Sequence, residues 1–195
     1  MPRERGRLQL LYFGSAAGEA EWPKWPLPEV AVGGRSNVGK SSLLNALGGS
    51  RKLARVSRTP GRTQRLHFFR DARGGLALVD LPGWGFARAS RRDREAWGRA
   101  VERYLDGRQN LRALLLLLDV RRLPEEDEAR IADFAAARGL ALVRLATKVD
   151  RLGRAERERQ LRAMAEASGA PWLPFSAHTG EGRDRLIEAL EPFRD

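Results

Sequence analysis

Short apolar runs alternate with amphipathic stretches along this chain of 195 residues. Short runs rich in branched, leucine and aromatic residues predict strands, and apolar residues at helical spacing predict helices. The strands are expected at Leu8–Phe13, Glu29–Val32, Leu66–Arg70, Leu76–Val79, Leu114–Leu118, Ala141–Ala146 and Trp172–Pro174. The helices are expected at Ser42–Leu47, Arg94–Arg108, from Pro124 to Gly139, at Arg154–Ser168 and at Gly182–Phe193.

The order of these elements predicts an α/β fold. The strands Leu66–Arg70 and Leu76–Val79 are joined by "DARGG", a short glycine-containing loop typical of an antiparallel hairpin. The strand–helix–strand order elsewhere predicts parallel strands with right-handed crossovers. We therefore expect a mostly parallel sheet with one antiparallel edge hairpin and helices on both faces. Ligands of such sheets bind beyond the carboxyl ends of the strands.

Length and composition narrow the class of protein. No repeat or linker interrupts residues 1–195, so one domain is expected, with residues 1–28 as a short N-terminal strand extension packed on it. The chain has no cysteine and two histidines, which excludes thiolate chemistry and a histidine-rich metal site. The longest apolar stretch, Ala113–Leu118, is too short to span a membrane. Gln9 interrupts the apolar part of a signal-like N-terminus, so we expect a cytoplasmic protein.

The positive charge is concentrated in one segment. The net charge is +11, and residues 51–112 hold 16 Lys and Arg against 6 Asp and Glu. The other residues hold 20 against 19, so nearly all the excess lies in this basic segment. Such asymmetry favours a polyanionic partner, with nucleic acid as the leading candidate. Solvated arginines without a partner are the alternative.

The first chemical motif is "GRSNVGKS", between a predicted strand and a predicted helix. It fits the phosphate-binding pattern G-x-x-x-x-G-K-[ST], in which backbone amides surround the phosphates. Lys40 would reach the β and γ phosphates, and the Ser41 hydroxyl would ligate Mg²⁺. An ordinary glycine-rich turn is the alternative. The motif comprises Gly34, Arg35, Ser36, Asn37, Val38, Gly39, Lys40 and Ser41.

Two further motifs are expected to sense the γ-phosphate. "TPGRTQR" lies in a long loop, where Thr63 could reach Mg²⁺ and the γ-phosphate, and it includes Gly61, Arg62, Gln64 and Arg65. "DLPG" directly follows a strand and comprises Asp80, Leu81, Pro82 and Gly83. Asp80 could hold Mg²⁺ through water, and the Gly83 amide could donate to the γ-phosphate. Either motif alone is also an ordinary loop or turn.

The last two motifs predict which base is bound. "TKVD" comprises Thr147, Lys148, Val149 and Asp150, and "FSAH" begins with Phe175, Ser176 and Ala177. The Asp150 carboxylate can accept from N1–H and the N2 amino group of guanine, a donor pair that adenine lacks. Lys148 can cover the purine face with its stem, and the Ala177 amide can donate to guanine O6. All five motifs in order predict a guanine-nucleotide-binding P-loop protein.

The chain resembles the EngB (YihA/YsxC) family of bacterial GTPases over nearly its whole length. The segments that carry the resemblance are "GRSNVGKSSLLNAL", "TPGRTQ", "DLPGWGFA", "REAWG", "TKVD" and "FSAHTGEG". It implies a small G domain with Mg²⁺-dependent GTP binding and hydrolysis. It also implies a role in assembly of the large ribosomal subunit, linked to normal cell division and septation. The family pattern places GTP at Gly34–Ser41, Gly61–Arg65, Asp80–Gly83, Thr147–Asp150 and Phe175–Ala177, with the metal at Ser41 and Thr63.

Trp84 occupies the place where many GTPases carry the glutamine that orients the attacking water. An indole has one N–H donor and no acceptor, so we expect Trp84 to pack away from the phosphates. Lys40, Thr63 and Asn37 are the candidate catalytic residues. Asn37 could ligate a potassium ion against the phosphates, as the resemblance suggests, or could simply stabilise the loop.

Three functions remain open from the sequence. The first is a GTP-hydrolysing switch that acts on the large ribosomal subunit or its precursor, contacting rRNA through residues 51–112. The second is an rRNA-binding module in which GTP is a structural ligand with negligible turnover. A P-loop kinase is disfavoured, because no acceptor-binding lid is evident and a guanine reader is unnecessary there. We expect a monomer.

Overall fold

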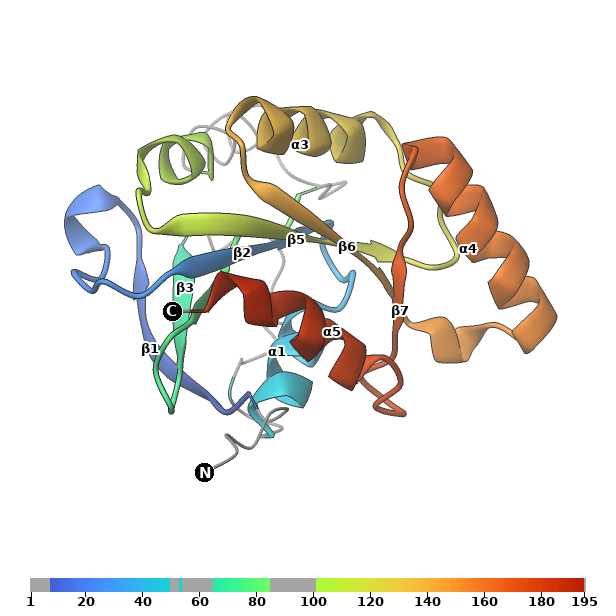
Figure 1. Ribbon diagram of the computed structural model, residues 1–195, viewed down its shortest axis with the longest axis horizontal. Coiled ribbons are helices and arrows are strands. Elements are labelled where there is room, and N and C mark those ends of the chain that lie inside the picture. The colour runs from blue at the N-terminus through green and yellow to red at the C-terminus, as the bar shows by residue number, and fades with distance from the viewer. Residues whose placement is uncertain (1–7, 50–52, 54–64, 85–100, 195) are drawn as a thin grey trace.

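The computed structural model describes residues 8–49, 53, 65–84 and 101–194. The strands are β1 (Leu10–Ala16), β2 (Glu29–Gly34), β3 (Leu66–Asp71), β4 (Ala77–Asp80), β5 (Leu111–Asp119), β6 (Ala141–Thr147) and β7 (Leu173–Phe175). They form one seven-stranded sheet in the order β1-β3-β4-β2-β5-β6-β7 (Figure 1). The phosphate-binding motif leaves the sheet from β2, which lies at its centre.

The sheet is parallel at its centre and antiparallel at one edge. Strand β2 pairs in parallel with β4 and β5, and β6 pairs in parallel with β5 and β7. Strand β3 is antiparallel to β4, which confirms the predicted edge hairpin. Strand β1 extends this edge by pairing antiparallel with β3, and a bulge falls between Tyr12 and Gly14. Strand β1 is therefore the outermost strand.

Helices cover both faces of the sheet (Figure 1). They are α1 (Lys40–Gly48), α3 (Glu126–Ala137), α4 (Arg154–Ser168) and α5 (Arg183–Leu190), with short 3-10 turns at Glu19–Glu21, Val149–Arg151 and Glu191–Phe193. Residues 101–107 are also helical. Successive side chains of a strand point alternately into two packed layers. Val30 and Val32 face α1 and α5, whereas Ala31 faces Tyr104 and α3. This burial on both faces is typical of parallel strands.

The predicted elements are confirmed with shifted ends. Helix α4 has the predicted bounds, whereas β1 begins two residues later than expected and β5 begins three residues earlier. Helix α3 starts one residue after Glu125, which caps it through a reciprocal capping box with Glu128. Of the helix predicted at Arg94–Arg108, residues 94–100 lie outside the described residues. No helix in the described ranges is long and apolar enough to cross a membrane.

A buried carboxylate anchors the start of β2. Glu29 is fully buried and accepts hydrogen bonds from Trp25 Nε1 at 2.6 Å, Tyr104 Oη at 2.7 Å and Arg108 Nε at 2.9 Å. A second Arg108 nitrogen also pairs with it. This Glu29 network joins the central strand to the helix at residues 101–107 and to the segment before β2. Such a buried carboxylate is tolerated because charge and hydrogen bonds are both satisfied.

Candidate nucleotide site

The phosphate-binding motif forms the turn between β2 and α1. Asn37 and Gly39 both have positive φ angles, +62° and +116°. Glycine adopts such angles without strain, and asparagine tolerates the left-handed region better than most other residues. The turn leads directly into α1, which begins at Lys40. The first amides of a helix lack partners within the helix, so they are available to bind phosphate.

Lys40 and Asp80 lie close together at the carboxyl ends of the central strands. The Lys40 Nζ donates to the Gly34 carbonyl oxygen at 3.3 Å. Burial lowers the pKa of Lys40, an effect that the Asp80 charge partly offsets. Burial also raises the pKa of Asp80 to about 6, although Lys40 acts in the opposite direction. A phosphate bound here would favour the charged form of Lys40, and a cation bound here would favour the ionised form of Asp80.

The "DLPG" turn packs tightly on the phosphate-binding loop. A Cβ added at Gly83 would lie 2.7 Å from Lys40 Nζ and 3.1 Å from the Ser36 amide nitrogen, so any side chain there would displace the lysine. The Ser36 amide donates to the Trp84 carbonyl oxygen at 2.7 Å. Glycine at this position permits the close approach that a contact between the Gly83 amide and a γ-phosphate would need.

The Trp84 side chain belongs to the core. It is 6% exposed and packs with Leu116 and Leu118 of β5. A Cβ built on Gly33 would lie 3.4 Å from Cζ3 of this indole. The sequence prediction that Trp84 packs away from the phosphates is thus confirmed. Trp84 holds the "DLPG" turn on the sheet, and its indole offers no acceptor for a proton of water.

Asp150 lies at the opposite end of the site, beside "FSAH". The Ser176 hydroxyl donates to Asp150 Oδ1 at 2.6 Å and accepts from the amides of His178 and Thr179. The hydrogen bond from Ser176 is the largest cause that lowers the pKa of Asp150. The side chain is 19% exposed, so it is more open than the buried acceptor expected from the sequence. Ser176, for which the sequence suggested no side-chain role, therefore orients the carboxylate.

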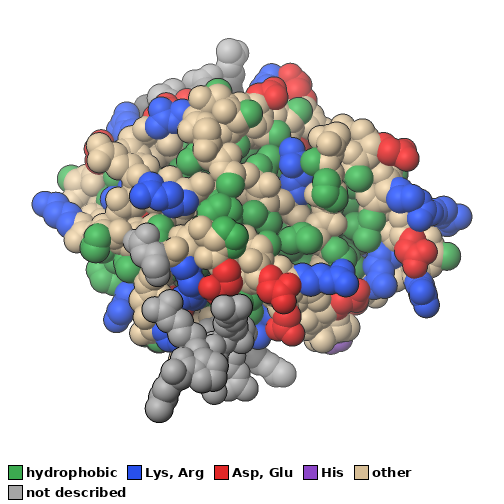
Figure 2. Space-filling model, viewed as in Figure 1, with side chains coloured by type: hydrophobic (Ala, Val, Ile, Leu, Met, Phe, Trp, Pro, Cys, Tyr) green, Lys and Arg blue, Asp and Glu red, His purple; other side chains and the backbone are tan. Residues whose placement is uncertain are grey.

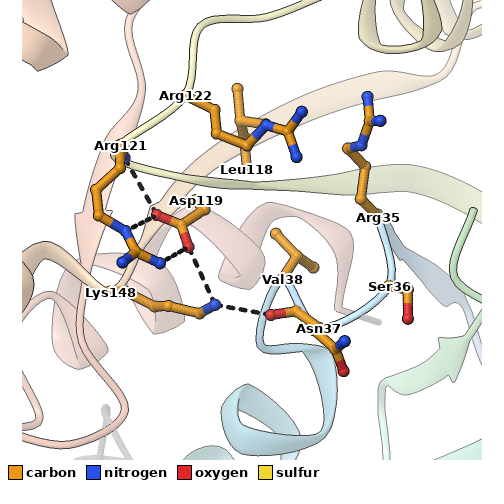
Figure 3. A pocket seen from close by; sticks show the side chains of 9 residues that line it. All are labelled: Arg35, Ser36, Asn37, Val38, Leu118, Asp119, Arg121, Arg122 and Lys148. Atoms are coloured by element: carbon orange, nitrogen blue, oxygen red, sulfur yellow. Dashed lines mark hydrogen bonds and ion pairs between the residues drawn. The ribbon is translucent and has the colours of Figure 1, made fainter. Parts of the chain in front are cut away.

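Lys148 is held by two partners (Figure 3). Its Nζ donates to the Asn37 carbonyl oxygen at 2.7 Å and lies 3.0 Å from Asp119 Oδ2. Asp119 also accepts from the Arg121 guanidinium. Burial alone would raise the pKa of Asp119, but hydrogen bonds from Arg121 and Lys148 lower it well below its usual range. The lysine therefore links the end of β6 to the phosphate loop and to the end of β5.

Asp119 and Arg121 were missed as site residues by the sequence reasoning. Their position could have indicated them, because Asp119 ends β5 at the same edge of the sheet as Gly34, Asp80 and Thr147, which end β2, β4 and β6. Thr147 is also more than a motif residue. Its buried hydroxyl donates to the Val38 carbonyl oxygen at 2.7 Å, which fixes the phosphate loop to β6. The base and phosphate segments are therefore one connected structure.

A cavity of about 370 Å³ lies beside the phosphate-binding loop. Figure 3 shows the Asp119 cluster on one side of it and Arg35 and Ser36 on the other. Glu125, the α3 cap, accepts from Arg35 at 2.8 Å and from Arg122 at 3.0 Å. These arginines are therefore already paired with carboxylates. The cavity is lined by Arg35, Ser36, Asn37, Val38, Leu118, Asp119, Arg121, Arg122 and Lys148.

Several predicted site residues lie elsewhere. Gly61, Arg62, Thr63 and Gln64 fall outside the described residues. Arg65 donates to Ser15 of β1 and to Glu21 in the following 3-10 turn, and its nucleotide contact stays a prediction. Other predicted members have side chains buried in the packed layers, although Val38 also lines the cavity. These are Val38, Leu81, Val149 and Phe175.

The donor set at the phosphate end fits Mg²⁺. Asp80 Oδ1 is buried and has no hydrogen-bond partner within the described part of the chain. Ser41 follows Lys40 in the first turn of α1, so a hydroxyl and a carboxylate belong to the same end of the sheet. Mg²⁺ prefers such oxygen ligands, completed by water and substrate phosphates. An orphaned buried carboxylate oxygen is the feature that an ion or its water would satisfy.

Comparison with known proteins identifies the family. The family described as 50S ribosome-binding GTPase matches residues 29–148. A probable GTP-binding protein EngB of Syntrophotalea carbinolica is 44% identical over 183 residues, which cover 92% of this chain and 88% of that protein. A probable GTP-binding protein EngB of Pelotomaculum thermopropionicum is 42% identical over 183 residues, covering 92% of each.

Solved structures share the fold. The crystal structure of a probable GTP-binding protein engB has a TM-score of 0.69 at 22% identity, covering 85% of this chain and 97% of that one. Aquifex aeolicus Era bound to GDP and aluminium fluoride has a TM-score of 0.68 at 19% identity, covering 87% and 57%. At these identities the likeness establishes the fold alone.

Proposed function

This chain belongs to the EngB family of GTP-binding proteins and is a GTPase by that membership, and we propose that it is a Mg²⁺-dependent switch. It would act on the large ribosomal subunit or its precursor in the cytoplasm, in a role linked to cell division and septation. The observation that carries the chemistry is the convergence of Lys40, Asp80, Lys148 and Asp150 along one edge of the sheet. The ribosomal role is supported by the family description and by the basic segment at residues 51–112.

The described residues divide into two binding groups. Lys40 and the amides of the phosphate loop would bind the phosphates, and Asp150 would accept the donor edge of guanine. Thr147 joins the two groups through its hydrogen bond to the Val38 carbonyl oxygen. Ser41, Asp80 and Thr63 would hold Mg²⁺, which supplies neutralisation of charge between the β and γ phosphates.

Hydrolysis requires a water oxygen to attack the γ-phosphorus while the bond to the β–γ bridging oxygen breaks. The products are GDP and inorganic phosphate, and the proton of the attacking water passes to a phosphate oxygen or solvent. Lys40 would stabilise charge on the leaving GDP. Because Trp84 is buried and lacks an acceptor, it does not orient this water. We therefore propose slow turnover alone, with stimulation by a partner.

Potassium is proposed as a second source of stimulation. The Asn37 carboxamide oxygen is positioned on the phosphate loop, and a monovalent cation there would offset transition-state charge as an arginine finger does. The positive φ of Asn37 also supports the alternative, a residue selected for the loop conformation. We expect turnover to rise about tenfold when K⁺ replaces Na⁺, a lowering of the barrier by about 1.4 kcal/mol.

Asn37→Gly separates these two roles, since glycine accepts the positive φ but removes the carboxamide. We expect the variant to bind GTP while losing the response to K⁺, as measured by phosphate release at matched ionic strength. A retained tenfold response would remove Asn37 as the ligand, and equal wild-type rates in both salts would remove the potassium proposal.

Binding to ribosomal particles tests the function itself. We expect the GTP form to cosediment with large subunits more strongly than the GDP form, and added salt to weaken that binding steeply because phosphate contacts release counterions. Neutralising Arg88, Arg91 and Arg92 should weaken particle binding while sparing GTP affinity. Equal affinity of the two nucleotide forms would contradict a switch.

A second candidate function is an RNA-binding module with GTP as a structural ligand. The burial of Trp84 at the position that usually orients water favours it. It predicts that GTP stays bound without turnover even when ribosomal particles are present.

A further inference from the structure

The outer edge of the sheet exposes three consecutive large apolar side chains. Leu11 is 39% exposed, Tyr12 is 48% exposed and Phe13 is 55% exposed. In the described part of the chain, Leu123 is the other large hydrophobic residue with comparable exposure. We call the three β1 residues, together with Trp25 beside them, the edge patch. Contiguous apolar exposure on an outermost strand commonly marks an interaction site.

The rings of the edge patch lie on both sides of β1. Phe13 packs against Trp25 with ring centroids 4.7 Å apart, whereas Tyr12 contacts His67 at 6.2 Å and Phe69 at 5.4 Å. The bulge between Tyr12 and Gly14 leaves Phe13 without a paired residue on β3. Successive strand residues point to opposite faces, so two aromatic surfaces flank one backbone edge.

The aromatic surface is held rigidly from beneath. Trp25 Nε1 donates to Glu29 at 2.6 Å, and the Trp25 carbonyl accepts from Asn110 at 2.6 Å. Glu29 is in turn fixed by the buried Glu29 network. A ring fixed before binding loses little conformational freedom when a ligand stacks on it. Phe13 therefore rests on a support that is already ordered.

The charges around the edge patch suit a polyanion. Leu11 pairs directly with Arg70 of β3, so the exposed Arg70 side chain shares a face with Leu11 and lies on the face opposite to Tyr12. Lys24, also exposed, immediately precedes Trp25. The nearby carboxylates Glu29 and Asp71 are neutralised by Arg108 and Arg194. Along the left margin of Figure 2, where Figure 1 places β1, apolar and basic side chains lie side by side.

We propose that the edge patch binds single-stranded RNA, with unpaired bases stacking on Phe13 and Tyr12 and phosphates contacting Arg70 and Lys24. Single-stranded RNA is recognised by this combination of open aromatic faces and a cationic path for the backbone. The inference rests on the proposed function, since it names the surface that would contact rRNA. The proposed RNA contact lies outside the "TPGRTQR" and "DLPG" motifs, which are expected to sense the γ-phosphate.

The direct test uses a fluorescent single-stranded RNA of about 12 nucleotides and fluorescence anisotropy with a GTP analogue present. Phe13→Leu and Tyr12→Leu remove a ring but keep apolar bulk, and each should weaken binding about tenfold. Leu123→Ala changes an equally exposed apolar residue elsewhere and should leave binding unchanged. Arg70→Gln should lower the salt dependence by about one phosphate contact. GTP affinity should match wild type in every variant, and each variant should still unfold cooperatively.

The same variants on large ribosomal subunits separate failure of this inference from failure of the proposed function. If wild type binds subunits but the leucine variants bind equally well, the edge patch is not an RNA surface. If the leucine variants bind and Phe13→Ser does not, the patch docks an apolar protein surface, which also overturns the proposal. Wild type that binds the RNA but not the subunits contradicts the ribosomal role alone. Wild type that does not bind the RNA overturns the inference.

Discussion

At the scale of single residues, base selection depends on a carboxylate that a neighbour orients. Ser176 donates to Asp150 at 2.6 Å, and this bond favours the ionised form that guanine requires. Replacing Asp150 with Asn puts a donor opposite the guanine amino group. A site built on hydrogen bonds to its ligand loses much affinity when a donor faces a donor, so the GTP affinity of this variant should fall by at least about 100-fold.

Competition against a fluorescent GDP analogue measures this change, with xanthosine triphosphate as the matched ligand. Xanthine carries a carbonyl where guanine carries the amino group, so Asp150→Asn should prefer it to GTP. Ser176→Ala is the companion variant and should weaken GTP binding about tenfold through loss of orientation. An Asp150→Asn variant with unchanged GTP affinity would show that the base binds elsewhere.

At the scale of elements, the hydroxyl of Thr147 joins two segments that are 109 residues apart. Thr147→Val keeps the shape but leaves the Val38 carbonyl without this donor. We expect the free energy of unfolding to fall by about 1–2 kcal/mol, since one buried acceptor loses its bond. Urea denaturation of the nucleotide-free protein measures it. Thr179→Val, at an exposed position, is the control, and equal losses in both variants would count against a special role for Thr147.

The elements were predictable because their signals are local. Helix α4 was found at its predicted bounds, since a glycine stands at each end of one uninterrupted amphipathic run. The Asp119–Lys148 contact was not predictable, because it depends on the register in which the parallel strands β5 and β6 pair. The orienting role of Ser176 was missed for a similar reason. A serine in a loop gives no signal of which carboxylate it will meet.

At the scale of the whole molecule, the Glu29 network ties the central strand to two distant segments. Glu29 is fully buried, and the Arg108 side chain is 12% exposed. Glu29→Gln removes the negative charge and leaves the largely buried Arg108 guanidinium without its counter-charge, which should cost about 3–5 kcal/mol of stability. Tyr104→Phe removes only a hydroxyl and should cost about 1–2 kcal/mol.

Thermal and urea unfolding check these values, with the exposed Glu19→Gln as the control for loss of a negative charge. A Glu29→Gln variant as stable as wild type would show that the network contributes no net stability. The sheet order and the outermost position of β1 also belong to this scale. The sequence predicted an N-terminal strand packed on the domain, but its pairing with β3 depends on contacts between residues at least 50 positions apart.

GTP turnover by the full chain, with and without purified large ribosomal subunits, tests the central claim most directly. Trp84 does not orient water, so the account predicts slow phosphate release alone and a rise of at least about tenfold when subunits are added. The measurement is made in K⁺ at constant ionic strength, with Lys40→Ala as the background. Turnover that stays at this background while the protein binds the subunits would contradict a hydrolytic switch.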